Sequence, residues 1–111
     1  MMARRPPKPT SARTVRRSDE RSNEKLAQDR IRLAKLSEGG AAERPITVES
    51  SSLVELRASA LPCPRCLGEQ RVDDHTAHAV AGDVLRAAHT RCKQCGFERT
   101  VWFRIAQRLA N

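Results

Sequence analysis

The chain carries two short cysteine motifs, Cys63-Pro64-Arg65-Cys66 and Cys92-Lys93-Gln94-Cys95-Gly96. They contain all four cysteines of the 111-residue chain and leave residues 67–91 between them. A CxxC turn directs two thiolates toward one point, and two such turns complete the tetrahedral sulfur cage that zinc prefers in structural sites. The sequence therefore predicts one structural zinc ion, with these metal ligands: Cys63, Cys66, Cys92 and Cys95.

The segment between the two motifs predicts a β-hairpin. Two strands of roughly nine residues, each rising about 3.3 Å per residue, would run out from the cage and return to it. The Gly82-Asp83 step lies near the middle and supplies residues suited to a turn.

Other uses of the cysteines fit less well. Disulfides need an oxidising compartment, and the N-terminal residues include no apolar stretch typical of a signal peptide or a membrane span. A redox CxxC usually accompanies a thioredoxin-like βαβ pattern, which is missing. Iron stays open, because four thiolates also hold iron, although rubredoxin-like sites usually place glycine after the CxxC and Leu67 stands there. We therefore expect a cytoplasmic protein without a membrane partner.

Composition indicates that the fold depends on its metal. Only three residues are aromatic, Phe97, Trp102 and Phe103, so apolar burial alone is a weak source of stability for so small a unit. Structural zinc contributes on the order of 10 kcal/mol to such folds. We expect a chelator to unfold the chain.

Residues 1–17 are interpreted as a disordered basic tail. They hold three prolines and no acidic residue, a composition typical of extended chain that contacts nucleic acid or an acidic partner. A solubilising leader and a transit peptide are the alternatives, and the prolines disfavour the second. The candidate binding residues of the tail are Arg4, Arg5, Lys8, Arg13, Arg16 and Arg17.

An α-helix is predicted over residues 18–38. Ser18 is a suitable N-cap, Asp19 and Glu20 favour the first turn, and Gly39-Gly40 ends the pattern. A helix of this length is marginal alone in water, so it is expected to pack on the hairpin or on a partner. Residues 18–40 have five basic and five acidic side chains, which disfavours phosphate binding by this segment.

Residues 39–60 are interpreted as a linker with a possible short strand. Residues 45–48 have the pattern of a strand, whereas Ser52-Leu53-Val54-Glu55 fits a capping box at the start of a short helix. For the second of these segments we nevertheless favour a strand, at residues 53–57. Residues 107–111 form a C-terminal end.

The paired motifs and the hairpin between them resemble the zinc ribbons of transcription-associated proteins. The resemblance covers about residues 61–105, and we place the zinc-ribbon domain at residues 61–106. It implies a small, metal-stabilised β fold, a three-stranded antiparallel zinc ribbon, here preceded by the basic tail and one α-helix. It also implies binding rather than catalysis.

One branch of these ribbons stimulates transcript cleavage through an acidic pair at the hairpin tip. This chain has Asp73-Asp74, but the pair lies near the base of the hairpin, and the tip offers only Asp83. We therefore expect no such activity, and interpret the pair as solvated strand residues.

The last strand predicts a binding face. In residues 97–105 the odd positions are mostly apolar and suit a buried face, while Trp102 and Arg104 fall on the wetter face. There they are expected either to stack a base or anchor a partner, or, for Trp102, to lie beneath the helix. The three histidines, His75, His78 and His89, are expected to be ordinary strand side chains, with His75 and His78 on opposite faces.

No phosphate loop, nucleophile with its base or open metal site is evident in the sequence. The expectation is a non-enzymatic binding module without a small-molecule substrate. It would associate with nucleic acid, or with a transcription or translation complex, through the basic tail and the ribbon face. The alternative is an adaptor whose helix and ribbon dock on a protein partner.

Overall fold

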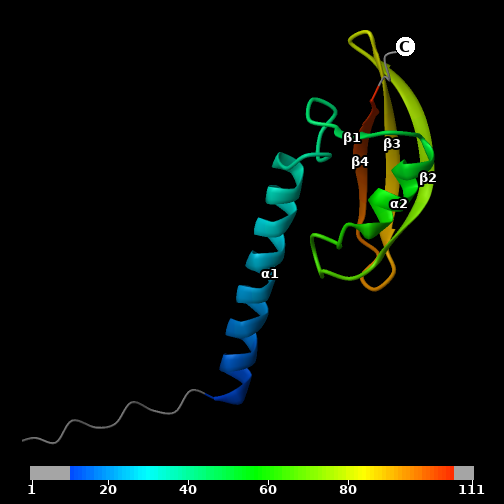
Figure 1. Ribbon diagram of the computed structural model, residues 1–111. Coiled ribbons are helices and arrows are strands. Elements are labelled where there is room, and N and C mark those ends of the chain that lie inside the picture. The colour runs from blue at the N-terminus through cyan, green and yellow to red at the C-terminus, as the bar shows by residue number, and fades with distance from the viewer. Residues whose placement is uncertain (1–10, 107–111) are drawn as a thin grey trace, which may run out of the picture.

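The computed structural model describes residues 11–106, which form two helices and one four-stranded sheet (Figure 1). The elements are α1 (Ala12–Leu36), β1 (Ile46–Val48), α2 (Ser52–Ala60), β2 (Gln70–Val80), β3 (Asp83–Cys92) and β4 (Glu98–Ile105). The strand order is β1-β4-β3-β2. The predicted sheet of three strands is one strand short, because β1 adds to β4 in parallel, with Ile46 opposite Phe103.

The long hairpin is confirmed. Strands β2 and β3 pair antiparallel from Gln70 opposite Cys92 to Val80 opposite Asp83. Ala81 and Gly82 make the two-residue turn, one position earlier than predicted, with φ angles of 50° and 85°. Positive φ at both central residues is the geometry that matches the twist of a tight hairpin.

The core lies between α2 and one face of the sheet. Val54 and Ala58, four residues apart on the same side of α2, are fully buried. They pack in a cluster that also contains these buried residues: Ile46, Val48, Ala88, Val101 and Phe103. The strand predicted at residues 53–57 is therefore wrong. The segment is helical, and the strand formed instead where residues 45–48 had indicated it.

Helix α1 begins earlier than predicted. Its N-cap is Ser11, whose hydroxyl accepts a hydrogen bond from the N–H of Thr14 over 3.2 Å, and not Ser18. Residues 12–17, which the sequence placed in a disordered tail, are thus helical. The remainder of that tail, with Arg4, Arg5 and Lys8, and the C-terminal residues 107–111 lie outside the described residues.

Only the C-terminal half of α1 approaches the sheet, while the N-terminal half projects away from it (Figure 1). Its partly buried residues are Ala27, Arg30, Ile31 and Ala34, and none is fully buried. The loop after the helix is tied to β4 by a hydrogen bond of 2.8 Å from the N–H of Trp102 to the carbonyl of Gly39. Within residues 11–106, no helix combines the length and the apolarity needed to cross a membrane.

Candidate functional site

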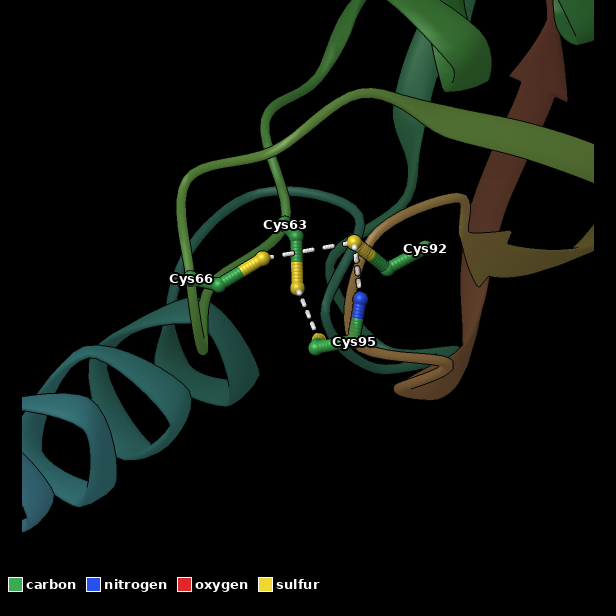
Figure 2. A group of neighbouring side chains, drawn as sticks. All are labelled: Cys63, Cys66, Cys92 and Cys95. Atoms are coloured by element: carbon green, nitrogen blue, oxygen red, sulfur yellow. Dashed lines mark hydrogen bonds between the residues drawn. The ribbon is translucent and has the colours of Figure 1, made fainter.

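The four cysteines come together where the two motifs meet at the base of the hairpin (Figure 2). Their Sγ atoms all lie within 4.8 Å of one another; the Cys66–Cys92 distance is 3.3 Å and the Cys63–Cys95 distance 3.6 Å. Zn–S bonds of about 2.3 Å in a tetrahedron would place sulfur atoms about 3.8 Å apart. None of the four forms a disulfide. The cluster therefore has the donors and the spacing to hold one metal ion.

Two turns position these thiols, here named the first knuckle (Cys63–Leu67) and the second knuckle (Cys92–Gly96). Backbone N–H groups point at the sulfurs: Gly68 donates to Cys66, and Gln94 and Cys95 donate to Cys92, each over 3.4 Å. Such donors stabilise a thiolate.

The thiol pKa values respond to these contacts. The N–H of Cys95 contributes most to lowering the pKa of Cys92 to about 6, and the N–H of Gln94 adds to it. The hydrogen bond with Cys92 raises the pKa of Cys66. The backbone N–H donors at Cys92 therefore favour the thiolate form that a metal ion requires.

Arg30 of helix α1 is hydrogen-bonded to the turn that carries Cys63 and Cys66. Arg30 donates from Nε to the carbonyl of Pro64 over 3.0 Å and from a terminal nitrogen to the carbonyl of Arg65 over 2.8 Å. Both carbonyls belong to the first knuckle. The orientation of the helix is therefore coupled to the shape of that turn.

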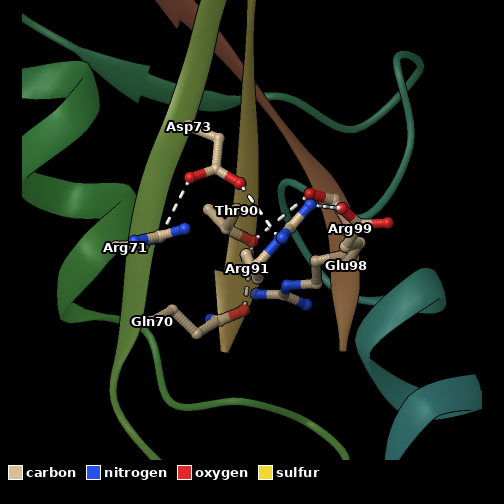
Figure 3. Close-up of polar contacts among 7 residues, drawn as sticks. All are labelled: Gln70, Arg71, Asp73, Thr90, Arg91, Glu98 and Arg99. Atoms are coloured by element: carbon tan, nitrogen blue, oxygen red, sulfur yellow. Dashed lines mark hydrogen bonds and ion pairs between the residues drawn. The ribbon is translucent and has the colours of Figure 1, made fainter. Parts of the chain in front are cut away.

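A buried polar network next to the cage was not predicted (Figure 3). Gln70 is 1% exposed and Thr90 fully buried. The Gln70 amide donates to the carbonyl of Leu61 over 2.8 Å and accepts from the Thr90 hydroxyl over 3.0 Å. That hydroxyl also lies 3.2 Å from the carbonyl of Arg99. The network joins β2, β3 and β4 to the chain that enters the first knuckle.

The acidic pair at the hairpin base is not simply solvated. A β-bulge between Val72 and Asp74 sets Asp73 apart, and its carboxylate pairs with Arg71 over 3.0 Å and with Arg91 over 3.2 Å (Figure 3). The Asp73 carboxylate also lies within 4.8 Å of the ligand atoms of His89 and Glu98. All three side chains have the chemistry of metal ligands. Arg91 pairs with both acids, so their charge is already offset by arginine.

The sheet face opposite α2 carries the predicted strand residues. Val101 and Phe103 are buried beneath α2, whereas Trp102 is partly exposed and Arg104 exposed, which confirms the alternation. The Trp102 ring lies 5.6 Å from that of His78. A shallow hollow of about 360 Å³ extends beside this pair and His89. His75 lies on the other face, 3.8 Å from Glu55 of α2.

Trp102 also lines a second hollow of about 220 Å³ together with Ile31 and Ala34 of α1. One side of the indole thus faces the hollow that it shares with α1. The opposite side faces His78 and the solvent-exposed sheet.

Most of the positive charges of α1 lie along one side of the helix. Residues four or seven apart share a helix face. Four cations of α1 follow one another at a spacing of four residues, and a fifth lies seven residues after the last of them. We name the following set the basic stripe: Arg13, Arg17, Arg21, Lys25 and Arg32. All five are exposed, and none forms an ion pair with any residue in 11–106. Glu24 is the acidic residue within the stripe.

The predicted site residues thus fall into separate places. The four cysteines form one cluster; Arg13, Arg16 and Arg17 lie on the projecting half of α1; and Trp102 and Arg104 lie on β4. Helical geometry, unlike the linear sequence, aligns Arg21, Lys25 and Arg32 with Arg13 and Arg17. In comparisons with known proteins, no family model, no curated protein and no solved structure matches the chain.

Proposed function

We propose that this chain is a non-enzymatic zinc-ribbon module that binds the phosphate backbone of nucleic acid through the basic stripe of α1. One Zn²⁺ held by the four cysteines serves a structural role, because four protein ligands close the coordination shell and leave no position for a substrate. Elemental analysis with native mass spectrometry of the purified chain tests the metal. One zinc per chain is expected, and one iron per chain would replace zinc in the proposal.

The observation that supports nucleic-acid binding is the set of unpaired cations on a helix that stands away from the sheet. Residues 12–36 contain eight basic and four acidic side chains, a net charge of +4. The earlier start of the helix adds Arg13, Arg16 and Arg17 to a segment that was neutral over residues 18–40. A positive stripe on one helix face is the electrostatic signature of phosphate recognition.

The test is the salt dependence of binding to a 20-base-pair DNA duplex of random sequence. Changing Arg13, Arg17 and Arg21 together to Gln keeps a good helix former at each position. The slope of log affinity against log salt should fall by up to about 2.7 units, at about 0.9 for each phosphate that is no longer neutralised.

A matched control removes the same charge elsewhere. Arg57, Arg65 and Lys93 are exposed, and the one ion pair among them, Lys93 with Glu69 at 3.5 Å, is a surface pair of small energy. Changing these three to Gln should leave most of the slope. Equal losses in both triple variants would mean that only net charge matters, and the stripe would not be the interface.

The Trp102 face is the second part of the proposed interface. Trp102 is the single tryptophan of the chain, so its fluorescence reports directly on contact with a base. Quenching by single-stranded oligonucleotide, reduced in Arg104→Gln, would support stacking at this face. Unchanged fluorescence at saturating oligonucleotide would restrict the interface to α1.

A further inference from the structure

An apolar groove lies between α1 and the first knuckle. Its volume is about 280 Å³, which is below the usual range for small-molecule pockets and suits one or two side chains of a protein segment. Its apolar lining consists of Leu33, Ala34, Leu61, Pro62, Pro64 and Leu67. This groove is separate from the basic stripe, which lies on another side of α1.

Leu67, one of the groove residues, has a backbone conformation that is unfavourable for a residue with a side chain. Its φ angle is 64°, in the left-handed region that glycine adopts without strain. The corresponding residue of the second knuckle is Gly96, with φ 75°. Leu67 nevertheless leaves 61% of its surface exposed, so the side chain contributes little to the core. An exposed leucine in a strained position indicates a role outside folding.

The apolar surface continues along α1. Leu33 is 65% exposed, and Leu26, seven residues earlier on the same side, is 55% exposed. Positions seven apart align along one helix face. Together with Leu67 they form an apolar track that leads from the projecting helix into the groove, and such a track is typical of a site for a protein segment.

Two cations, Arg30 and Arg99, line the groove beside the Cys63 sulfur, and neither pairs with an Asp or Glu side chain of residues 11–106. Arg30 donates to the backbone carbonyls of Pro64 and Arg65 and to no carboxylate of residues 11–106. Arg99 is partly buried, and its Nε has no hydrogen-bond partner within residues 11–106. Burial lowers the pKa of the Arg99 guanidinium, and the attraction of the Cys63 sulfur opposes that shift. Glu38 is the one acid in the lining. A partly buried arginine without a hydrogen-bonded acceptor favours an incoming carboxylate.

We propose that this groove docks a short acidic segment of a protein partner, with an aliphatic side chain packed between Leu33 and Leu67 and a carboxylate bound to Arg99. The net charge of +8 favours the approach of an acidic segment. This interaction is independent of phosphate binding by the basic stripe.

The experiment selects peptides from a displayed library of random 12-residue sequences against the full chain loaded with zinc. Enriched sequences that combine Leu, Ile or Phe with Asp or Glu are expected. Their affinity, measured by fluorescence anisotropy, should fall at least tenfold in Leu67→Gly and in Arg99→Gln, and Arg99→Lys should retain part of it. Leu67→Gly is informative because glycine adopts the same backbone without strain, so the variant folds while losing the side chain.

Leu56→Ala is the matched control, since Leu56 is 64% exposed on α2, away from the groove. It should bind the selected peptides like the unaltered chain. Peptides that bind Leu67→Gly with undiminished affinity, or the absence of any acidic enriched class, would overturn the proposal. So would a dimer in sedimentation analysis that Leu67→Gly dissolves, because a second copy would then fill the groove. Loss of duplex binding in Leu67→Gly would instead assign the groove to the nucleic-acid interface.

Discussion

The first and second knuckles close around the metal position with the same backbone hydrogen bonds but with different neighbours. The N–H of Leu67 donates to the carbonyl of Cys63 over 2.8 Å, and that of Gly96 to the carbonyl of Cys92 over 3.1 Å. In each turn the N–H of the first cysteine donates over 2.9 Å to the carbonyl five residues on. In each, the first cysteine is buried and the second exposed. The two knuckles thus form nearly equivalent halves of the cysteine cluster, here called half-sites.

The surroundings of the two turns differ. The first knuckle receives Arg30 of α1 on its carbonyls and places a leucine where the backbone favours glycine. The second has that glycine, Gly96, and a Cβ added there would meet no atom within 4 Å. The sequence departs from the local optimum on the side where another element docks. This difference between Leu67 and Gly96 is the observation on which the docking proposal rests.

The flanks of the knuckles are joined by different means. On either side of the second knuckle, β3 and β4 pair directly, with Arg91 opposite Glu98. The chain before the first knuckle is not a strand there, and the side chain of Gln70 connects it to β2 through the carbonyl of Leu61. Backbone pairing holds one half-site, and a buried amide holds the other.

The largest effect expected from breaking this equivalence comes from the cysteines themselves. Cys63→Ser and Cys92→Ser should each lose the metal under conditions where the unaltered chain keeps it, and the sheet should unfold. The reason is that structural zinc contributes on the order of 10 kcal/mol to the free energy of folding, and neither half-site alone supplies four ligands. Thermal melting by circular dichroism, with metal content by elemental analysis, measures both.

Ser22→Ala is a suitable control, because Ser22 is exposed on the projecting half of α1, away from both knuckles. It should melt with the unaltered chain. A cysteine variant that keeps its metal and its melting temperature would show that the two half-sites do not share one ion.

A smaller effect is expected from Gln70→Ala. The change leaves the buried carbonyl of Leu61 without its donor and removes one of the two acceptors near the Thr90 hydroxyl, which should lower the free energy of unfolding by about 1–3 kcal/mol. Gln94→Ala makes the same chemical change in the second knuckle, where the side chain is exposed, and should cost less than about 0.5 kcal/mol. Urea unfolding of the zinc-loaded chains compares them.

If the two glutamine variants lose equal stability, the first knuckle is no more dependent on a side-chain connection than the second. Gln70→Glu refines the result. It keeps the size and the acceptor but loses the donor to Leu61 and buries a charge, so it should be at least as unstable as Gln70→Ala.

The parts of this comparison that follow from local pattern could be predicted from the sequence. Motif spacing indicated the four cysteines and the hairpin, and alternation indicated the buried Val101 and Phe103. The network of Gln70 and Thr90 has no such pattern. Which polar side chains meet inside a sheet depends on strand register, and the register includes a bulge at Asp73 that no local signal indicates.

The two helices show why the other elements were misplaced. Ser18 followed by two acids has a more favourable N-terminal signal than Ser11, yet no glycine or proline separates the two serines, and a helix once formed extends at little cost. In the linker, the helix α2 is favoured because it buries Val54 and Ala58 against the sheet. Tertiary contacts of that kind outweigh local propensity in so short a segment.

The smallest and most direct test exchanges the two residues that distinguish the half-sites. A left-handed backbone costs a residue with a side chain roughly 1–2 kcal/mol relative to glycine, while glycine loses about 0.5–1 kcal/mol through its freer unfolded chain. Leu67→Gly should therefore be neutral or stabilising by up to about 1 kcal/mol, because its exposed side chain leaves little buried surface to lose. Gly96→Leu should destabilise by a similar amount.

Chemical denaturation of the zinc-loaded variants measures both changes, and the double exchange checks whether they add. Additivity is expected, because the two positions lie in separate turns and share no contact beyond the common metal site. A marked loss of stability in Leu67→Gly would mean that Leu67 stabilises the fold through α1, and its strain would then need no external partner. A stable Leu67→Gly chain that no longer binds acidic peptides would separate the two half-sites by role: both hold the metal, and only the first presents a docking surface.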